Sequence, residues 1–85
     1  MAEITKEVKV GLEEGLEPRE TAELVQLVCK YRTEKFTIDY NDKLINPKSL
    51  MSAMYLAALK DTVFTVKVEG PEAEAALEAV EKFLA

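Results

Sequence analysis

Residues 36–49, FTIDYNDKLINPKS, predict a β-hairpin that leads into a helix. Apolar and polar side chains alternate from Phe36 to Tyr40, which is typical of a strand with one buried face. Asn41 and Asp42 suit a two-residue hairpin turn, and the KLIN segment after them can return as a short strand. The stretch therefore predicts an antiparallel pair of strands within a sheet.

A helix is expected directly after this hairpin. Pro47 cannot continue the hydrogen-bonded ladder of the strands, and Ser49 is a favoured residue at a helix N-cap. The helix would run over about residues 50–59. The residues expected to anchor it to the core are Leu56, Ala57 and Leu59.

Upstream of the hairpin, the sequence predicts another strand and another helix. Apolar side chains fall on one side of a period-two pattern over residues 4–12, and Gly15 supplies a turn. Pro18 suits the first position of the helix that follows. The apolar stripe of this helix reaches Cys29, which we expect to be a buried structural thiol.

Downstream, residues 62–70, TVFTVKVEG, predict a fourth strand, and Gly70 and Pro71 end it before a last helix. The order is then β-α-β-β-α-β-α. This order predicts an α+β fold of two layers, in which three helices cover one face of a four-stranded antiparallel sheet. The stripe expected to be buried on the last helix is Ala73, Ala76, Leu77, Val80 and Leu84.

The composition fits one globular domain over residues 1–85. The formal charge of −5 argues against nucleic acid as a partner, because phosphates require a basic surface. The first ten residues hold no continuous apolar run, so we expect neither a signal peptide nor a membrane span. A soluble, cytoplasmic protein is the expectation.

The sequence contains no histidine. This excludes a histidine general base, a phosphohistidine and nearly every common zinc site. A glycine-rich phosphate loop and a Cys-x-x-Cys pair are also missing. We therefore expect no cofactor and no metal.

Two motifs, in this order of elements, resemble the HPr family of the bacterial phosphoenolpyruvate-dependent sugar phosphotransferase system. The first is GLEPR at residues 15–19, where the family usually reads Gly-Leu-His and carries an arginine two residues after the histidine. The second is PKSLMSAM at residues 47–54, which is similar to the family's segment around a regulatory serine. The resemblance covers essentially the whole chain. It implies an open-faced β-sandwich and a small protein that docks onto other proteins.

The resemblance places Glu17 where the family has its phosphoacceptor histidine, which receives a phosphoryl group from Enzyme I. Arg19 matches the assisting arginine, and Glu20 matches the usual proline. Because a carboxylate is no substitute for an imidazole nucleophile, we expect no relay through this position and no enzyme activity. Two interpretations of Glu17 stay open: a fixed charge that imitates phosphohistidine, or a solvated acid at a helix start. Arg19 either contributes to partner binding or only pairs with Glu20 or Glu23 at the surface.

Ser49 matches the regulatory serine, which is the target of HPr kinase/phosphorylase in the family. Its residue type is equally explained by helix capping, so both roles stay open. The resemblance also implies a docking surface next to this serine. The residues expected to form it are Lys48, Leu50, Met51 and Met54, together with Arg19.

Three functions compete at this point. The first is a non-relaying regulatory protein that resembles the Crh-type members, which act with a LacI-type repressor in carbon catabolite control; these usually carry glutamine where this chain has Glu17. The second is a binding domain reused outside sugar transport, with no phosphorylation. The third, an acylphosphatase-like enzyme, fits poorly because Arg19 lacks a glycine-rich cradle. Partners would be proteins of the phosphotransferase system, and the chain a monomer or weak dimer.

Overall fold

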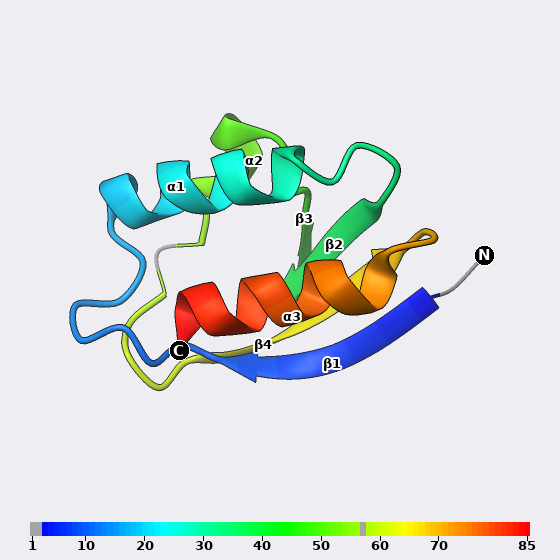
Figure 1. The fold of residues 1–85 in the computed structure, drawn as a ribbon. Helices are drawn as coiled ribbons and strands as arrows, with labels where there is room; N and C mark the ends of the chain where they lie inside the picture. The colour runs from blue at the N-terminus through cyan, green and yellow to red at the C-terminus, as the bar shows by residue number, and fades with distance from the viewer. Residues whose placement is uncertain (1–2, 57) are drawn as a thin grey trace.

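The computed structural model describes residues 3–56 and 58–85, which form a helical layer on one face of a sheet (Figure 1). The predicted α+β fold and element order are confirmed. The elements are β1 (Glu3–Lys9), α1 (Pro18–Cys29), β2 (Lys35–Tyr40), β3 (Lys43–Ile45), α2 (Leu50–Ala53), β4 (Val63–Glu69) and α3 (Ala73–Leu84).

The four strands pair antiparallel in the order β1-β4-β2-β3. In the register, Val66 of β4 lies opposite Lys6 of β1 and Ile38 of β2. Phe64, Val66 and Val68 are buried under the helices, whereas Thr65 and Lys67 between them are partly exposed. The alternation gives the sheet one apolar face under the helices and one polar face toward solvent.

The hairpin turn and the last helix are as the sequence predicts. Asn41 and Asp42 both have positive φ, 52° and 63°, which is the backbone that a type I′ turn requires. On α3, the whole predicted stripe is buried. On α1, the buried side chains are Thr21, Leu24 and Val28.

The first strand is shorter than the predicted residues 4–12, because β1 ends at Lys9. The chain after it leaves the sheet to contact two other segments. The Val10 N–H donates to Thr62 O at 2.8 Å, and the Gly11 N–H donates to Leu84 O at 2.6 Å. These bonds satisfy the backbone of Val10 and Gly11 outside the ladder.

The predicted helix over residues 50–59 is wrong in length. Helix α2 has only four residues and ends at Ala53. Leu56 is fully buried after the helix has ended, whereas Leu59 is 73% exposed and does not anchor the segment. Ala57 lies outside the described residues. Beyond the end of the helix, Ala58 O accepts a hydrogen bond from Leu16 N at 2.7 Å, which joins this segment to the loop before α1.

Cys29, expected to be buried, is exposed. It is the last residue of α1 and follows the buried Val28, so its side chain lies about 100° around the helix from the buried stripe. Its thiol lies 3.6 Å from Lys48 O as a weak donor. Across the part of the chain that the structure describes, no helix is long and apolar enough to cross a bilayer.

Candidate functional site

The loop before α1 carries carboxylates close to the helix N-terminus. Glu17 is the N-cap residue, with extended backbone at φ −80° and ψ 169°, and its carbonyl accepts from Thr21 N at 2.9 Å. The Glu17 side chain is exposed and makes no capping hydrogen bond. Pro18 occupies the first turn, where the missing N–H costs nothing. The backbone of Glu17 is therefore fixed by the helix start, whereas its carboxylate makes no capping bond.

Arg19 lies at the surface beside two acids of its own helix. Its side chain is 85% exposed, with Nε 3.4 Å from Glu20 Oε2 and 3.7 Å from Glu23 Oε1. Such exposed pairs contribute about 0.5 kcal/mol or less to stability. The surface pairing expected for Arg19 is thus present, and its role in partner binding stays a prediction.

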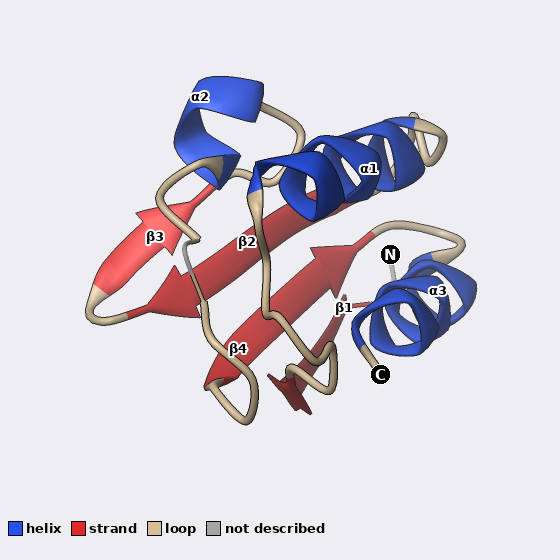
Figure 2. Cartoon of the chain, turned by 90° about the vertical axis from the view of Figure 1, so that its left-hand side faces the viewer, coloured by secondary structure: helices blue, strands red, loops and turns tan. Residues whose placement is uncertain are grey.

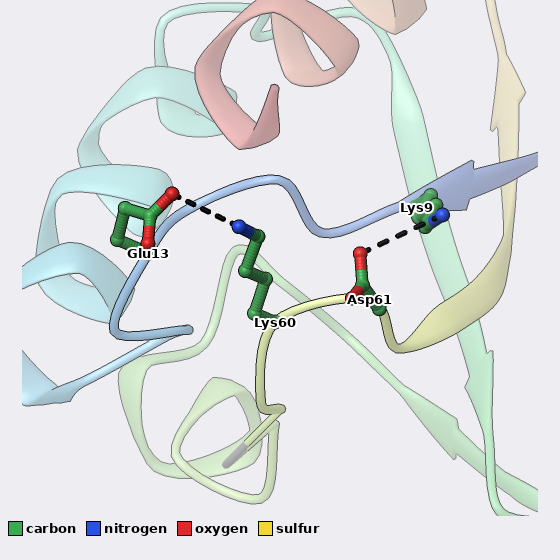
Figure 3. Close-up of polar contacts among 4 residues, drawn as sticks. All are labelled: Lys9, Glu13, Lys60 and Asp61. Atoms are coloured by element: carbon green, nitrogen blue, oxygen red, sulfur yellow. Dashed lines mark hydrogen bonds and ion pairs between the residues drawn. The ribbon is translucent and has the colours of Figure 1, made fainter.

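The segment after α2 packs against the loop before α1. Gly15 is buried with φ +73°, and a Cβ there would lie 2.3 Å from Ala58 O. The loop and the segment after α2 are joined at the same end of the molecule, which faces the viewer in Figure 2. Glu13 Oε1 also accepts from Lys60 Nζ at 2.9 Å, and Lys9 Nζ lies 3.5 Å from Asp61 Oδ1 (Figure 3).

Ser49 is the N-cap of α2. Its backbone is extended, its Oγ accepts from Ser52 N at a long 3.4 Å, and its carbonyl accepts from Ala53 N at 2.8 Å. The residue is partly exposed. Ser52, which the sequence did not single out, uses its Oγ to accept from Asn46 N at 3.0 Å. The predicted capping role of Ser49 is confirmed, and its phosphorylation stays a prediction.

The charged end of Lys48 does not point to solvent, as it would in a residue that docks a partner. Its ammonium group donates to Tyr31 O at 2.7 Å and to Glu34 O, and it lies 5.6 Å from the centre of the Phe36 ring. The charged end is therefore directed into the molecule, toward the loop between α1 and β2. Only the remainder of the residue, which is partly exposed, is left for contact with a partner.

The other predicted docking residues do form an exposed apolar surface, here called the apolar patch. It consists of Leu50, Met51, Met54 and Tyr55, with exposed fractions of 51%, 84%, 47% and 66%. Sequence reasoning missed Tyr55, although an aromatic residue directly after Met54 was a visible signal. Lys43 Nζ lies 5.3 Å from the centre of the Tyr55 ring and borders the apolar patch on the side of β3.

The structure does not bring Glu17 and Ser49 together. Ser49 follows Lys48, whose carbonyl contacts Cys29 at the C-terminal end of α1, whereas Glu17 is at the other end of that helix. Twelve helical residues separate these ends by about 18 Å. The segment after the apolar patch leads back to the loop, where Ala58 O accepts from Leu16 N. No group of three histidine, cysteine or acidic side chains in residues 3–56 and 58–85 is placed to hold a metal ion.

Comparisons with known proteins agree with this arrangement. A family model described as "PTS HPr component phosphorylation site" matches residues 4–85. The phosphocarrier protein HPr of Xylella fastidiosa is 36% identical over 66 residues, which is 78% of this chain and 73% of that protein. The HPr-like protein Crh of Halalkalibacterium halodurans is 35% identical over 81 residues, 95% of each chain.

Solved structures give the same result. HPr from Bacillus anthracis superposes with a TM-score of 0.91 at 34% identity, covering 100% of both chains. Crh from Bacillus subtilis, whose crystal structure is described as a swapped dimer, superposes with a TM-score of 0.72 at 30% identity, covering 95% of this chain and 92% of that one. The chain belongs to the HPr family.

Proposed function

We propose that this chain is an HPr-like regulatory protein of carbon metabolism that docks onto proteins and does not relay phosphate through histidine. The observation that carries the proposal is the chain without histidine, in which the N-cap of α1 is Glu17. In the resemblance to the family, this is the position of the phosphoacceptor. Partners would include HPr kinase/phosphorylase and a LacI-type repressor or other phosphotransferase-system proteins.

The chemistry of the loop argues against a relay. Transfer through phosphohistidine needs a neutral ring nitrogen that attacks phosphorus, and a carboxylate offers only anionic oxygen. Glu17 and Glu20 also repel an incoming phosphoryl group. Only Arg19 in this loop would attract the group, so two negative charges oppose one positive charge under the same exposure to solvent.

A switch at Ser49 is compatible with its geometry. The Ser49 Oγ is partly exposed and makes only the 3.4 Å bond to Ser52 N, so its loss to a phosphate ester removes little. A phosphate would add about 1.5 to 2 negative charges at pH 7 directly beside Met51 and Met54. Such a change at the edge of an apolar surface alters which proteins can dock there.

A second candidate is an HPr-fold binding domain reused outside sugar transport, with no phosphorylation. The observation in its favour is that capping already accounts for Ser49: the side chain accepts from Ser52 N and the carbonyl from Ala53 N. A serine retained only as a cap requires no kinase.

Intact-mass spectrometry of the purified protein separates these functions. One sample is incubated with Enzyme I and phosphoenolpyruvate, the other with HPr kinase/phosphorylase and ATP. We expect one phosphate from the kinase alone, lost in Ser49→Ala and kept in the matched control Ser52→Ala. No phosphate from either enzyme favours the reused binding domain, and labelling by Enzyme I contradicts the interpretation of Glu17.

A further inference from the structure

We propose that the docking surface of this protein selects a basic protein segment, one that sets an apolar anchor on the apolar patch and arginine or lysine side chains against the loop before α1. The inference rests on the proposed function and adds the chemistry of the partner. The loop is called the acidic loop below. Its carboxylates are those of Glu13, Glu14, Glu17 and Glu20.

The acidic loop contacts the segment that follows the apolar patch along the chain. Gly15 packs directly on Leu59, with a would-be Cβ 2.9 Å from the Leu59 Cα, and Leu16 N donates to Ala58 O. Leu59 is itself 73% exposed, as is Tyr55 at 66%, whereas Leu56 and Ala58 between them are buried. Figure 2 shows both segments at the end of the molecule that faces the viewer. A single partner segment can therefore cover the two together.

The charges of the acidic loop are only partly neutralised within the protein. Glu13 pairs with Lys60 at 2.9 Å, and Glu20 pairs with Arg19 at 3.4 Å. Glu14 and Glu17 are exposed, and neither forms an ion pair with any residue among 3–56 and 58–85. Two free carboxylates at the rim of an apolar surface favour a cationic partner, since rim charges act on partner choice.

Other occupants fit the surface less well. A second copy docked by a two-fold axis would bring the same acidic loop toward its own symmetry mate, with like charges facing each other. An acidic protein would meet the same repulsion. Lys43 supplies a positive charge over the Tyr55 ring, on the side of β3. The cationic side chains of the partner must therefore face the α1 side of the surface.

The test uses two synthetic helical peptides with the same pair of leucines one turn apart, flanked by arginines in one and by glutamates in the other. Binding to the unphosphorylated protein is followed by NMR titration at low and high salt. We expect the arginine peptide to bind about tenfold more tightly, with shifts at Met51, Tyr55 and Glu14, and to lose this advantage at high salt.

Matched variants locate the selection on the surface. Glu14→Gln with Glu17→Gln should remove the preference between the peptides. Glu7→Gln with Glu74→Gln, two exposed carboxylates on other elements, changes the net charge equally and should keep it. Met51→Ser with Met54→Ser should abolish binding of both peptides.

Equal affinity for the two peptides, no binding of the arginine peptide, or an equal effect of the control pair overturns the inference. Its failure is distinguishable from failure of the proposed function, because the kinase labelling of Ser49 is measured without any peptide. If the kinase labels Ser49 but the protein does not prefer the arginine peptide, the proposed function is supported and the further inference is wrong.

Discussion

At the scale of single residues, Lys48 joins three parts of the chain through one side chain. Its ammonium group donates to Tyr31 O and Glu34 O and lies over the Phe36 ring. We expect Lys48→Met, which keeps an aliphatic stem, to lower the free energy of unfolding by about 1–3 kcal/mol, because two carbonyls lose a charged donor. Urea denaturation followed by circular dichroism measures this change.

Lys43→Met is the matched control for that substitution. Lys43 is exposed, and its ammonium lies only over the Tyr55 ring, an interaction worth about 0.5–1 kcal/mol at an exposed site. Equal destabilisation by the two substitutions would show that the hydrogen bonds of Lys48 to the loop between α1 and β2 contribute nothing to stability.

Cys29 offers a second residue-scale prediction. Because the residue is exposed at the end of α1, we expect a maleimide reagent to label the folded protein completely in native buffer. Cys29→Ala should change the free energy of unfolding by no more than about 0.5 kcal/mol, as surface substitutions usually do. Labelling that requires urea, measured by mass spectrometry over time, would contradict the exposed position.

At the scale of elements, the sequence predicted the turns and helix faces that depend only on neighbouring residues. The turn at Asn41 and Asp42 and the buried stripe of α3 follow from residue type and period, and both are confirmed. The segment after α2 instead makes contacts with distant parts of the chain, the burial of Leu56 and the Leu16–Ala58 hydrogen bond, which no pattern within residues 50–59 contains. A tertiary contact overrides helix propensity there.

In the candidate site, too, some features follow from the local sequence and others depend on contacts with distant residues. The resemblance to the family implied an exposed surface at Met51 and Met54, and both side chains are exposed. The inward orientation of Lys48 could not be predicted, because its acceptors are backbone carbonyls of Tyr31 and Glu34, and every residue type supplies such carbonyls. When a side chain binds a distant backbone group, the type of the residue that supplies that group does not reveal the contact.

Gly15 carries the element-scale prediction, since it sets the loop before α1 against the segment after α2. Gly15→Ala should lower the free energy of unfolding by at least about 2 kcal/mol, because of its positive φ and the 2.3 Å approach to Ala58 O. The urea midpoint measures the loss. Gly15→Asn tolerates positive φ but brings the same Cβ, so recovery of stability in that variant would show that the close approach costs little.

At the scale of the whole molecule, the structure bears on oligomeric state through the segment after β1. In a swapped dimer β1 would regain its contacts on the partner chain, so the cost of exchange falls on this segment, which would be the hinge and would have to change its conformation. Val10 and Gly11 are held by backbone hydrogen bonds to Thr62, Asp61 and Leu84, between 2.6 and 2.8 Å. Each such bond contributes about 1 kcal/mol net, more than an exposed ion pair.

We therefore expect a monomer of 9.5 kDa in light scattering coupled to size exclusion, at low and at high salt alike. The exposed pairs of Glu13 with Lys60 and of Lys9 with Asp61 also join this segment to its neighbour, as Figure 3 shows. Glu13→Gln with Asp61→Asn removes both pairs, and asparagine accepts the positive φ of 72° at that position. If the backbone bonds hold the segment, the variant stays monomeric; a mass twice as large, in the variant or at high salt, would show that the ion pairs prevent exchange of β1.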